Sequence, residues 1–178
     1  MRPLRRLRAI EDKRERLLAW VEGLDAGLVT TPPAPGKWSI HEIVEHLVRA
    51  EESVMGDVAS LDERVPRRRT LRGRLLYWLV ILILRFDIPV EVPDPSMLPN
   101  GEPSLDELGG RWRRNHARLR HWLEGLSNDE GRGAYFRHPV VGGMTAAQSL
   151  LMLDVHLDRH VRAMRATVRA MRRKEREA

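Results

Sequence analysis

The sequence predicts an all-α protein built as a bundle of long helices. Three observations lead to this class: apolar residues recur with the helical period over several long segments, capping patterns mark helix starts, and strand patterns are almost absent. The chain has 178 residues, of which 42% are hydrophobic, so it is long enough and apolar enough to bury a core. No internal repeat divides it, and we expect one domain over residues 1–178.

Capping patterns mark the start of three helices. Each has Ser or Thr followed three residues later by Glu or Gln, so that the two side chains satisfy free backbone N–H groups of the first turn reciprocally. The three patterns are Ser39–Glu42, Ser104–Glu107 and Thr145–Gln148. Each precedes a segment with helical periodicity, which predicts a helix beginning there.

Five helices are expected in all. The third carries the most apolar run, Leu75–Leu84, and ends before Pro89. Between it and the next helix, five prolines predict a long structured loop over Asp87–Pro103, of a length that often covers a functional site. Phe136–Met144 is expected to be a turn-rich connection. The other four helices are predicted over Leu4–Leu24, from Ser39 to about Leu61, from Leu105 to about Leu126, and from Thr145 to about Met171.

The apolar run Leu75–Leu84 is too short to span a membrane, which takes about 20 apolar residues. It predicts a buried helix, or one whose outer face packs against a second copy of the chain, so a homodimer is expected. The basic N-terminal segment has no apolar stretch after it and does not resemble a signal peptide. A cytoplasmic protein without a membrane span is therefore expected.

The composition restricts the chemistry. The chain has no cysteine, which excludes disulfides, thiolate nucleophiles and cysteine ligands and leaves His, Asp and Glu as metal ligands. The net charge is +6, a value that permits binding to nucleic acid or an anionic membrane. The arginines gather at both chain ends and in one connection, as solvated helix faces do, and no nucleic-acid motif accompanies them. No nucleic-acid partner is expected.

Two histidines, His156 and His160, lie one helical turn apart in the last apolar segment. Residues at i and i+4 share a helix face, so both imidazoles can reach one metal ion. His46, on a second amphipathic helix, would complete a three-histidine site with an open coordination position. The i, i+4 spacing alone is weak evidence, because such pairs more often arise by coincidence. His41 competes with His46 as the ligand from the second helix. The remaining histidines, which fit one shared metal less well, are His116, His121 and His138.

Three segments together resemble the DinB superfamily, which includes the YfiT-like proteins and the bacillithiol- and mycothiol-dependent transferases. They are Trp38–Leu47, His138–Thr145 and His156–His160. The resemblance implies a four-helix bundle in up-down-down-up order. The apolar third helix and the proline-rich loop of this chain are distinctive, so one additional helix or long loop is expected between the second and fourth helices. The resemblance also implies a divalent metal, most often zinc or nickel, held by His46, His156 and His160. Members often carry Gln three residues after the last ligand, where this chain has Ala163.

The resemblance implies a metal-dependent hydrolase or a small-thiol-dependent S-transferase acting on a small molecule. Because the chain has no cysteine, any thiol must come from a low-molecular-weight cofactor. Around the metal, Glu42 is the candidate to orient His46, and Arg159 is the candidate for an anionic substrate group, with a surface ion pair as the alternative. His138, Trp38 and Tyr135 are candidates to line the pocket. The competing functions are a catalytically inactive metal-binding or stress-response bundle and an anion-binding module that uses the arginine clusters.

Overall fold

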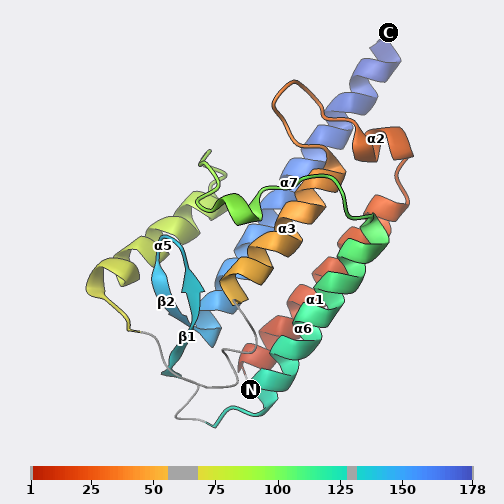
Figure 1. Ribbon diagram of the computed structural model, residues 1–178. Coiled ribbons are helices and arrows are strands. Elements are labelled where there is room, and N and C mark those ends of the chain that lie inside the picture. The colour runs from red at the N-terminus through yellow and green to blue at the C-terminus, as the bar shows by residue number, and fades with distance from the viewer. Residues whose placement is uncertain (1, 56–67, 128–131, 178) are drawn as a thin grey trace.

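The computed structural model describes residues 2–55, 68–127 and 132–177 of the chain. Four long helices form a bundle (Figure 1). The helices α1 and α7 run in one direction, while α3 and α6 run in the other, which confirms the predicted up-down-down-up order. The bundle helices are α1 (Arg2–Glu22), α3 (Ile40–Met55), α6 (Leu105–Glu124) and α7 (Ala146–Glu177).

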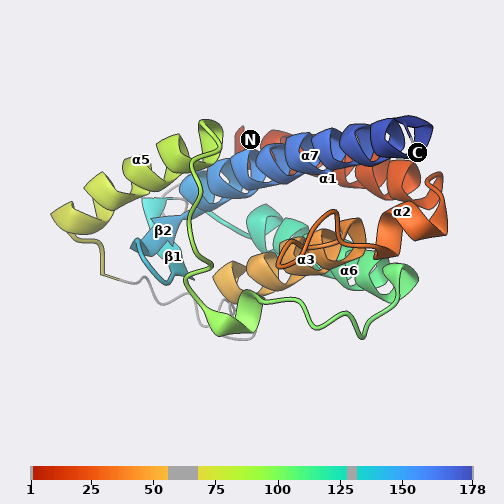
Figure 2. The same cartoon turned by 90° about the horizontal axis from the view of Figure 1, so that it is seen from above.

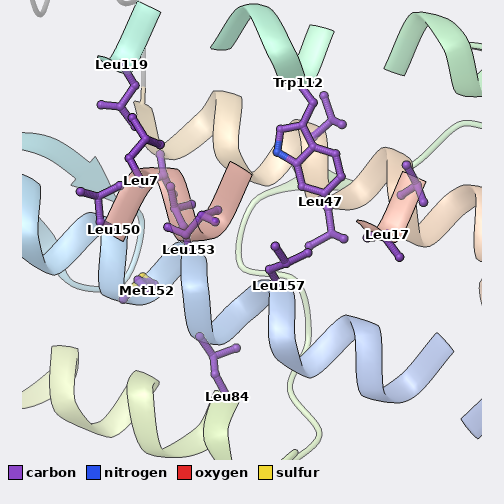
Figure 3. Packing of buried hydrophobic residues seen from close by; sticks show 14 of the residues in the cluster. Leu7, Leu17, Leu47, Leu84, Trp112, Leu119, Leu150, Met152, Leu153 and Leu157 are labelled. Atoms are coloured by element: carbon purple, nitrogen blue, oxygen red, sulfur yellow. The ribbon is translucent and has the colours of Figure 1, made fainter. Parts of the chain in front are cut away.

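The order of packing explains how one core serves all four helices. Helix α1 packs against α6 and α7, and α3 packs against the same two helices, so α1 and α3 lie across the bundle from each other. Each helix contributes fully buried side chains to the centre (Figure 3). Leu7, Leu47, Trp112 and Leu157 are examples, one from each helix. Burial of these apolar surfaces is the main stabilising contribution to the bundle.

The three predicted caps form as expected. At the start of α3 the backbone N–H of Ser39 donates to the Glu42 carboxylate at 2.7 Å, and the Glu42 N–H donates to Ser39 Oγ at 3.2 Å. The patterns at Ser104 and Thr145 make the same reciprocal bonds. Helix starts are therefore predicted well, while the expected end of the second helix near Leu61 lies outside the described residues.

The additional element between the second and fourth bundle helices is α5 (Leu71–Arg85), which packs along the first half of α7 (Figure 2). Tyr77 Oη donates to the Gln148 carbonyl at 3.1 Å, and a Cβ on Gly73 would meet the Val141 carbonyl oxygen at 2.5 Å. One face of α5 is thus held closely against the protein, while its opposite face is exposed. No helix in the described ranges is both long and apolar enough to cross a membrane.

Two short strands correct the expectation of a turn-rich connection before the last helix. Strands β1 (Ala134–His138) and β2 (Gly142–Thr145) form an antiparallel hairpin, with Gly142 at a φ of +80° where β2 leaves the turn. The pattern was missed because Tyr135 and Phe136 are both buried and the register shifts between Ala134 and Phe136, so side chains do not alternate between core and solvent. Two further short helices, α2 (Ala26–Thr30) and the 3₁₀ helix η1 (Pro95–Met97), were not predicted either.

Candidate metal centre

The structure brings the three histidines singled out in the sequence into one cluster. His46 comes from α3, and His156 and His160 come from consecutive turns of α7. One ring nitrogen of each lies within 4.8 Å of the other two, and the Nε2 atoms of His156 and His160 are 3.0 Å apart. Among the described residues, this is the only such group of three or more possible metal ligands.

The acidic residues beside these histidines in the sequence belong to another face of α7. Asp154 and Asp158 both accept hydrogen bonds from Lys13 Nζ of α1, at 2.6 and 2.7 Å. Residues two apart on a helix point in nearly opposite directions, so this pairing turns His156 and His160 away from α1 and toward α3. The cluster therefore contains three imidazoles and no carboxylate.

The ring of His46 is oriented by the loop that follows α5. Its Nδ1 lies 2.9 Å from the carbonyl oxygen of Met97 in η1, and a carbonyl only accepts. The proton of a neutral His46 is therefore on Nδ1, which leaves the lone pair of Nε2 available to a metal ion. A backbone carbonyl of this kind commonly orients a metal-binding imidazole.

The same loop is held to α3 by Glu45, the residue before His46. The backbone N–H groups of Asn100 and Gly101 donate to its carboxylate, the shortest bond being 2.8 Å, and Arg49 Nε donates at 2.7 Å. Burial acts to raise the pKa of Glu45, but these hydrogen bonds outweigh it and hold the pKa below its ordinary value. A charged, fully buried carboxylate thus fixes the segment that carries the Met97 carbonyl.

Burial keeps the three imidazoles neutral, which is the form that binds metal. It lowers the pKa of His160 to about 3 and that of His156 well below its ordinary value. The pKa of His46 is also lowered by burial, against the opposing effect of the Met97 hydrogen bond. The positive charge of Arg159 lowers all three further.

The cluster fits a divalent transition metal. Metal–nitrogen bonds of about 2.1 Å in a tetrahedral site place ligand nitrogens roughly 3.4 Å apart. The observed 3.0 Å between His156 and His160, and the limit of 4.8 Å for the whole set, require only small side-chain adjustments to reach that geometry. Three neutral nitrogen donors suit zinc and nickel, among other borderline metals.

The histidines line a cavity of about 680 Å³. Its walls come from α3, α5, the loop after α5, the hairpin and α7, and most of the lining side chains are apolar. Val54, Val80, Leu84, Met152 and Leu153 are among them. A mostly apolar cavity with a few convergent polar groups is typical of a small-molecule site.

Two predicted pocket residues, His138 and Arg159, line this cavity. Nδ1 of His138 accepts from the backbone N–H groups of Val140 and Val141 at 3.2 and 3.3 Å, so its proton is on Nε2. Burial lowers the pKa of His138 to about 4, which keeps the ring neutral. Arg159 donates to the Ile88 carbonyl at 2.9 Å and so lies between the cavity and the loop after α5. Trp38 also lines the cavity, whereas Tyr135 is buried beside Trp122.

The structure corrects the expected role of Glu42. Its carboxylate accepts from Ser39 in the cap of α3, and the hydrogen bond to the ring of His46 comes from Met97 instead. One residue cannot point its carboxylate both back over the first turn and forward to His46. The signal for Met97 was absent from the sequence because a backbone carbonyl has no residue preference, while Glu45 was visible only as a buried carboxylate in an apolar segment.

The remaining histidines lie outside the cluster. His41 Nε2 is 2.9 Å from the Pro103 carbonyl, which places it near the start of α6. His116 is buried between Arg14 and Glu51, and His121 is exposed on α6. None of these rings lines the cavity.

Comparison with known proteins agrees with this fold. The sequence model of the DinB superfamily matches residues 9–164. Among solved structures, YfiT from Bacillus subtilis is similar, with a TM-score of 0.60 and 16% identity over 94% of this chain and 86% of that chain. YfiT is described as a probable metal-dependent hydrolase with an unusual four-helix bundle topology. No curated protein matches the chain.

Proposed function

The chain belongs to the DinB superfamily, and from this membership and the geometry of its cavity we propose that it is a metal-dependent hydrolase of a small, largely apolar molecule. The proposed ligands are His46, His156 and His160, and the proposed metal is zinc or nickel. One observation carries the proposal: three neutral imidazoles converge at the wall of a cavity of about 680 Å³. A divalent metal bound there supplies a Lewis acid able to polarise a carbonyl and activate a water molecule.

The chain's own residues bind and orient the substrate in this proposal. The apolar walls bind its hydrocarbon part and exclude bulk water. His138, whose proton is on Nε2, donates a hydrogen bond to a substrate oxygen inside the cavity. Arg159 carries a full positive charge at the cavity wall and binds an anionic group of the substrate.

A second candidate function is transfer of a low-molecular-weight thiol. The observation that favours it is the combination of a large cavity with a chain that has no cysteine, so the cavity has room for an external thiol as well as its acceptor. The third function considered from the sequence, a catalytically inactive metal-binding bundle, is less favoured. Such a protein does not require an open apolar cavity beside the histidines.

The test begins with bound metal, measured by mass spectrometry on tag-free protein. We expect about one equivalent of zinc or nickel in the parent, its loss in His160→Ala, and no change in His121→Ala, a matched variant at an exposed histidine. Loaded protein is then assayed with chromogenic esters of increasing acyl length and with a chromogenic electrophile plus a small thiol. Metal-dependent ester cleavage supports the hydrolase, and metal-dependent thiol consumption supports the transferase. A parent that takes up no metal after reconstitution contradicts both.

A further inference from the structure

The outer face of α5 presents a continuous apolar surface to solvent. Six large hydrophobic side chains along it have exposed fractions between 48% and 77%. They are Leu71, Leu75, Trp78, Leu79, Leu82 and Phe86, and we call them the α5 stripe. At about 100° per residue they fall within an arc of roughly 100° on the helix, so they form one stripe rather than scattered exposed residues.

The exposure of the α5 stripe does not come from loose packing of the helix. The opposite face of α5 is held by the close approach of Gly73 to the Val141 carbonyl and by the hydrogen bond from Tyr77 to Gln148. Tyr77, Ile81 and Leu84 are buried against the protein. The stripe is therefore a fixed feature of the surface. It belongs to α5, which stands out from the bundle at the end where α7 begins (Figure 1).

Arginines border the stripe on both sides. At the same 100° spacing, Arg74 and Arg85 lie just beyond one edge of the stripe and Arg72 lies just beyond the other, and all three are exposed. Arg68 and Arg69, also exposed, precede the helix. Residues 68–86 contain five arginines and no Asp or Glu. Positive charge continues past the end of α5, where Arg162, Arg165 and Arg169 of α7 line a groove that begins at Asp87.

We propose that α5 docks this protein on an anionic lipid surface. The stripe enters the boundary between headgroups and acyl chains, and the flanking arginines meet the lipid phosphates. A helix with Trp, Phe and Leu on one face and arginines along its edges is the arrangement that lies in a membrane interface without crossing it. The tryptophan suits the headgroup level, and each arginine adds electrostatic attraction to anionic lipid. Docking goes beyond the proposed function and requires no metal.

A second copy of the chain, the partner expected from the sequence, fits the same surface less well. A two-fold interface through α5 brings one arginine border against another, and residues 68–86 offer no carboxylate to pair with them. The next acidic residue, Asp87, is already paired with Arg162 at 2.9 Å.

The experiment is co-sedimentation of the full chain with vesicles of phosphatidylcholine plus phosphatidylglycerol, and with vesicles of phosphatidylcholine alone. We expect binding to the mixed vesicles that weakens as salt is added, and little binding to phosphatidylcholine. Leu75→Ser with Leu79→Ser reduces the affinity roughly tenfold or more by removing buried apolar surface. Arg72→Glu with Arg74→Glu reduces it about 25-fold or more, because each lost positive charge costs roughly fivefold and each new carboxylate is repelled by the anionic lipid.

The matched control is Arg172→Glu with Arg173→Glu, which changes the net charge equally at the far end of α7 (Figure 1). It is expected to retain most of the binding, since only charges near the lipid contribute strongly. All of these positions are exposed, so circular dichroism is expected to show an unchanged fold. His160→Ala is also expected to bind vesicles fully, which separates a failure of docking from a failure of the proposed metal chemistry.

Three results would overturn the proposal. The first is a parent that does not sediment with anionic vesicles, and the second is a control variant that loses as much affinity as the Arg72/Arg74 variant. The third concerns oligomeric state, measured by light scattering. A parent dimer that becomes monomeric in the Leu75/Leu79 variant, with no vesicle binding in either, assigns the α5 stripe to a second copy of the chain.

Discussion

Histidines lie in two different surroundings in this bundle, one around His116 and one around His46, and α3 contributes to both. Around His116, each ring nitrogen has one strong partner: Arg14 Nη1 lies 2.7 Å from Nδ1, and Glu51 Oε2 lies 2.9 Å from Nε2. Arginine only donates, so Nδ1 accepts and Nε2 donates to the carboxylate. Every hydrogen-bonding site on this ring is used by the protein.

The cluster around His46 differs because its ring nitrogens face one another. The Met97 carbonyl uses one nitrogen of His46, while the Nε2 atoms of His156 and His160 lie 3.0 Å apart with no carboxylate in the group. Among the described residues, no arginine or lysine donates a hydrogen bond to these facing nitrogens. His46 and His116 are both buried, so burial alone does not distinguish a structural histidine from a candidate metal ligand. The partners of the ring nitrogens do: His116 has a cation and a carboxylate, whereas the rings of His156 and His160 have each other.

The largest effect that tests this comparison is on stability. His116→Ala leaves the buried Glu51 carboxylate without its donor, and we expect a loss of about 3 kcal/mol or more in the free energy of unfolding, with metal content unchanged. His160→Ala is expected to show the reverse. It loses bound metal, while the free energy of unfolding of its metal-free form stays within about 1 kcal/mol of that of the metal-free parent. Urea unfolding of metal-free proteins measures both.

His116→Gln is the control for that measurement, because an amide keeps one donor and one acceptor. It is expected to recover part of the lost stability. Equal losses of stability in His116→Ala and His160→Ala would mean that both histidines stabilise the fold to the same extent. The contrast drawn between them would then be wrong.

The second effect is a dependence of stability on pH in the metal-free protein. The pKa of His160 is lowered to about 3 in the folded chain, compared with about 6.5 when unfolded, so the unfolded state binds more protons between these values. The contribution of the neutral His160 ring to the free energy of unfolding is therefore fully present above pH 6.5. It is lost as the pH falls from 6.5 toward 3. His160 alone contributes a loss on the order of 2 kcal/mol by pH 5.

Unfolding of the parent and of His160→Ala at pH 5 and pH 8 measures this dependence. The variant is expected to lose less stability between the two pH values than the parent does. Identical slopes for the two proteins would show that the ring of His160 is not kept neutral by its surroundings.

The smallest effect concerns Glu42. Its carboxylate serves the cap of α3, so Glu42→Ala is expected to cost about 1 kcal/mol of stability and leave metal affinity nearly unchanged. Loss of a residue that orients a ligand typically weakens metal binding tenfold to a hundredfold. A drop of that size, in a chelator competition assay, would restore the role predicted for Glu42 from the sequence.

Much of the bundle could be predicted because its determinants are local. The caps at Ser39, Ser104 and Thr145 involve residues three apart, and the helical period is visible in any one segment. The hairpin could not be predicted, because Tyr135 and Phe136 are consecutive residues and both are buried. Buried and exposed residues therefore do not alternate along β1, and that alternation is what identifies a strand in a sequence. The short helix α2 is a single turn capped by Asp25, too brief for periodicity to show.

The candidate site divides in the same way. The i, i+4 spacing of His156 and His160 and the third histidine on α3 are side-chain signals, and the structure brings all three together. The group that orients His46 is a backbone carbonyl 51 residues away, held there by Glu45 through two backbone N–H groups. Every residue has a backbone carbonyl, so the residue type at position 97 does not indicate that its carbonyl contacts His46.

The bond between His46 and the Met97 carbonyl links the loop after α5 to whatever occupies the histidine cluster. By thermodynamic reciprocity, if the ordered loop strengthens metal binding through the ring of His46, then metal binding strengthens the order of the loop by the same factor. Sequence changes along the loop are then able to tune metal affinity without altering a ligand. The loop also forms part of the cavity wall, so the proposed function couples contact with a substrate to retention of the metal through one peptide group.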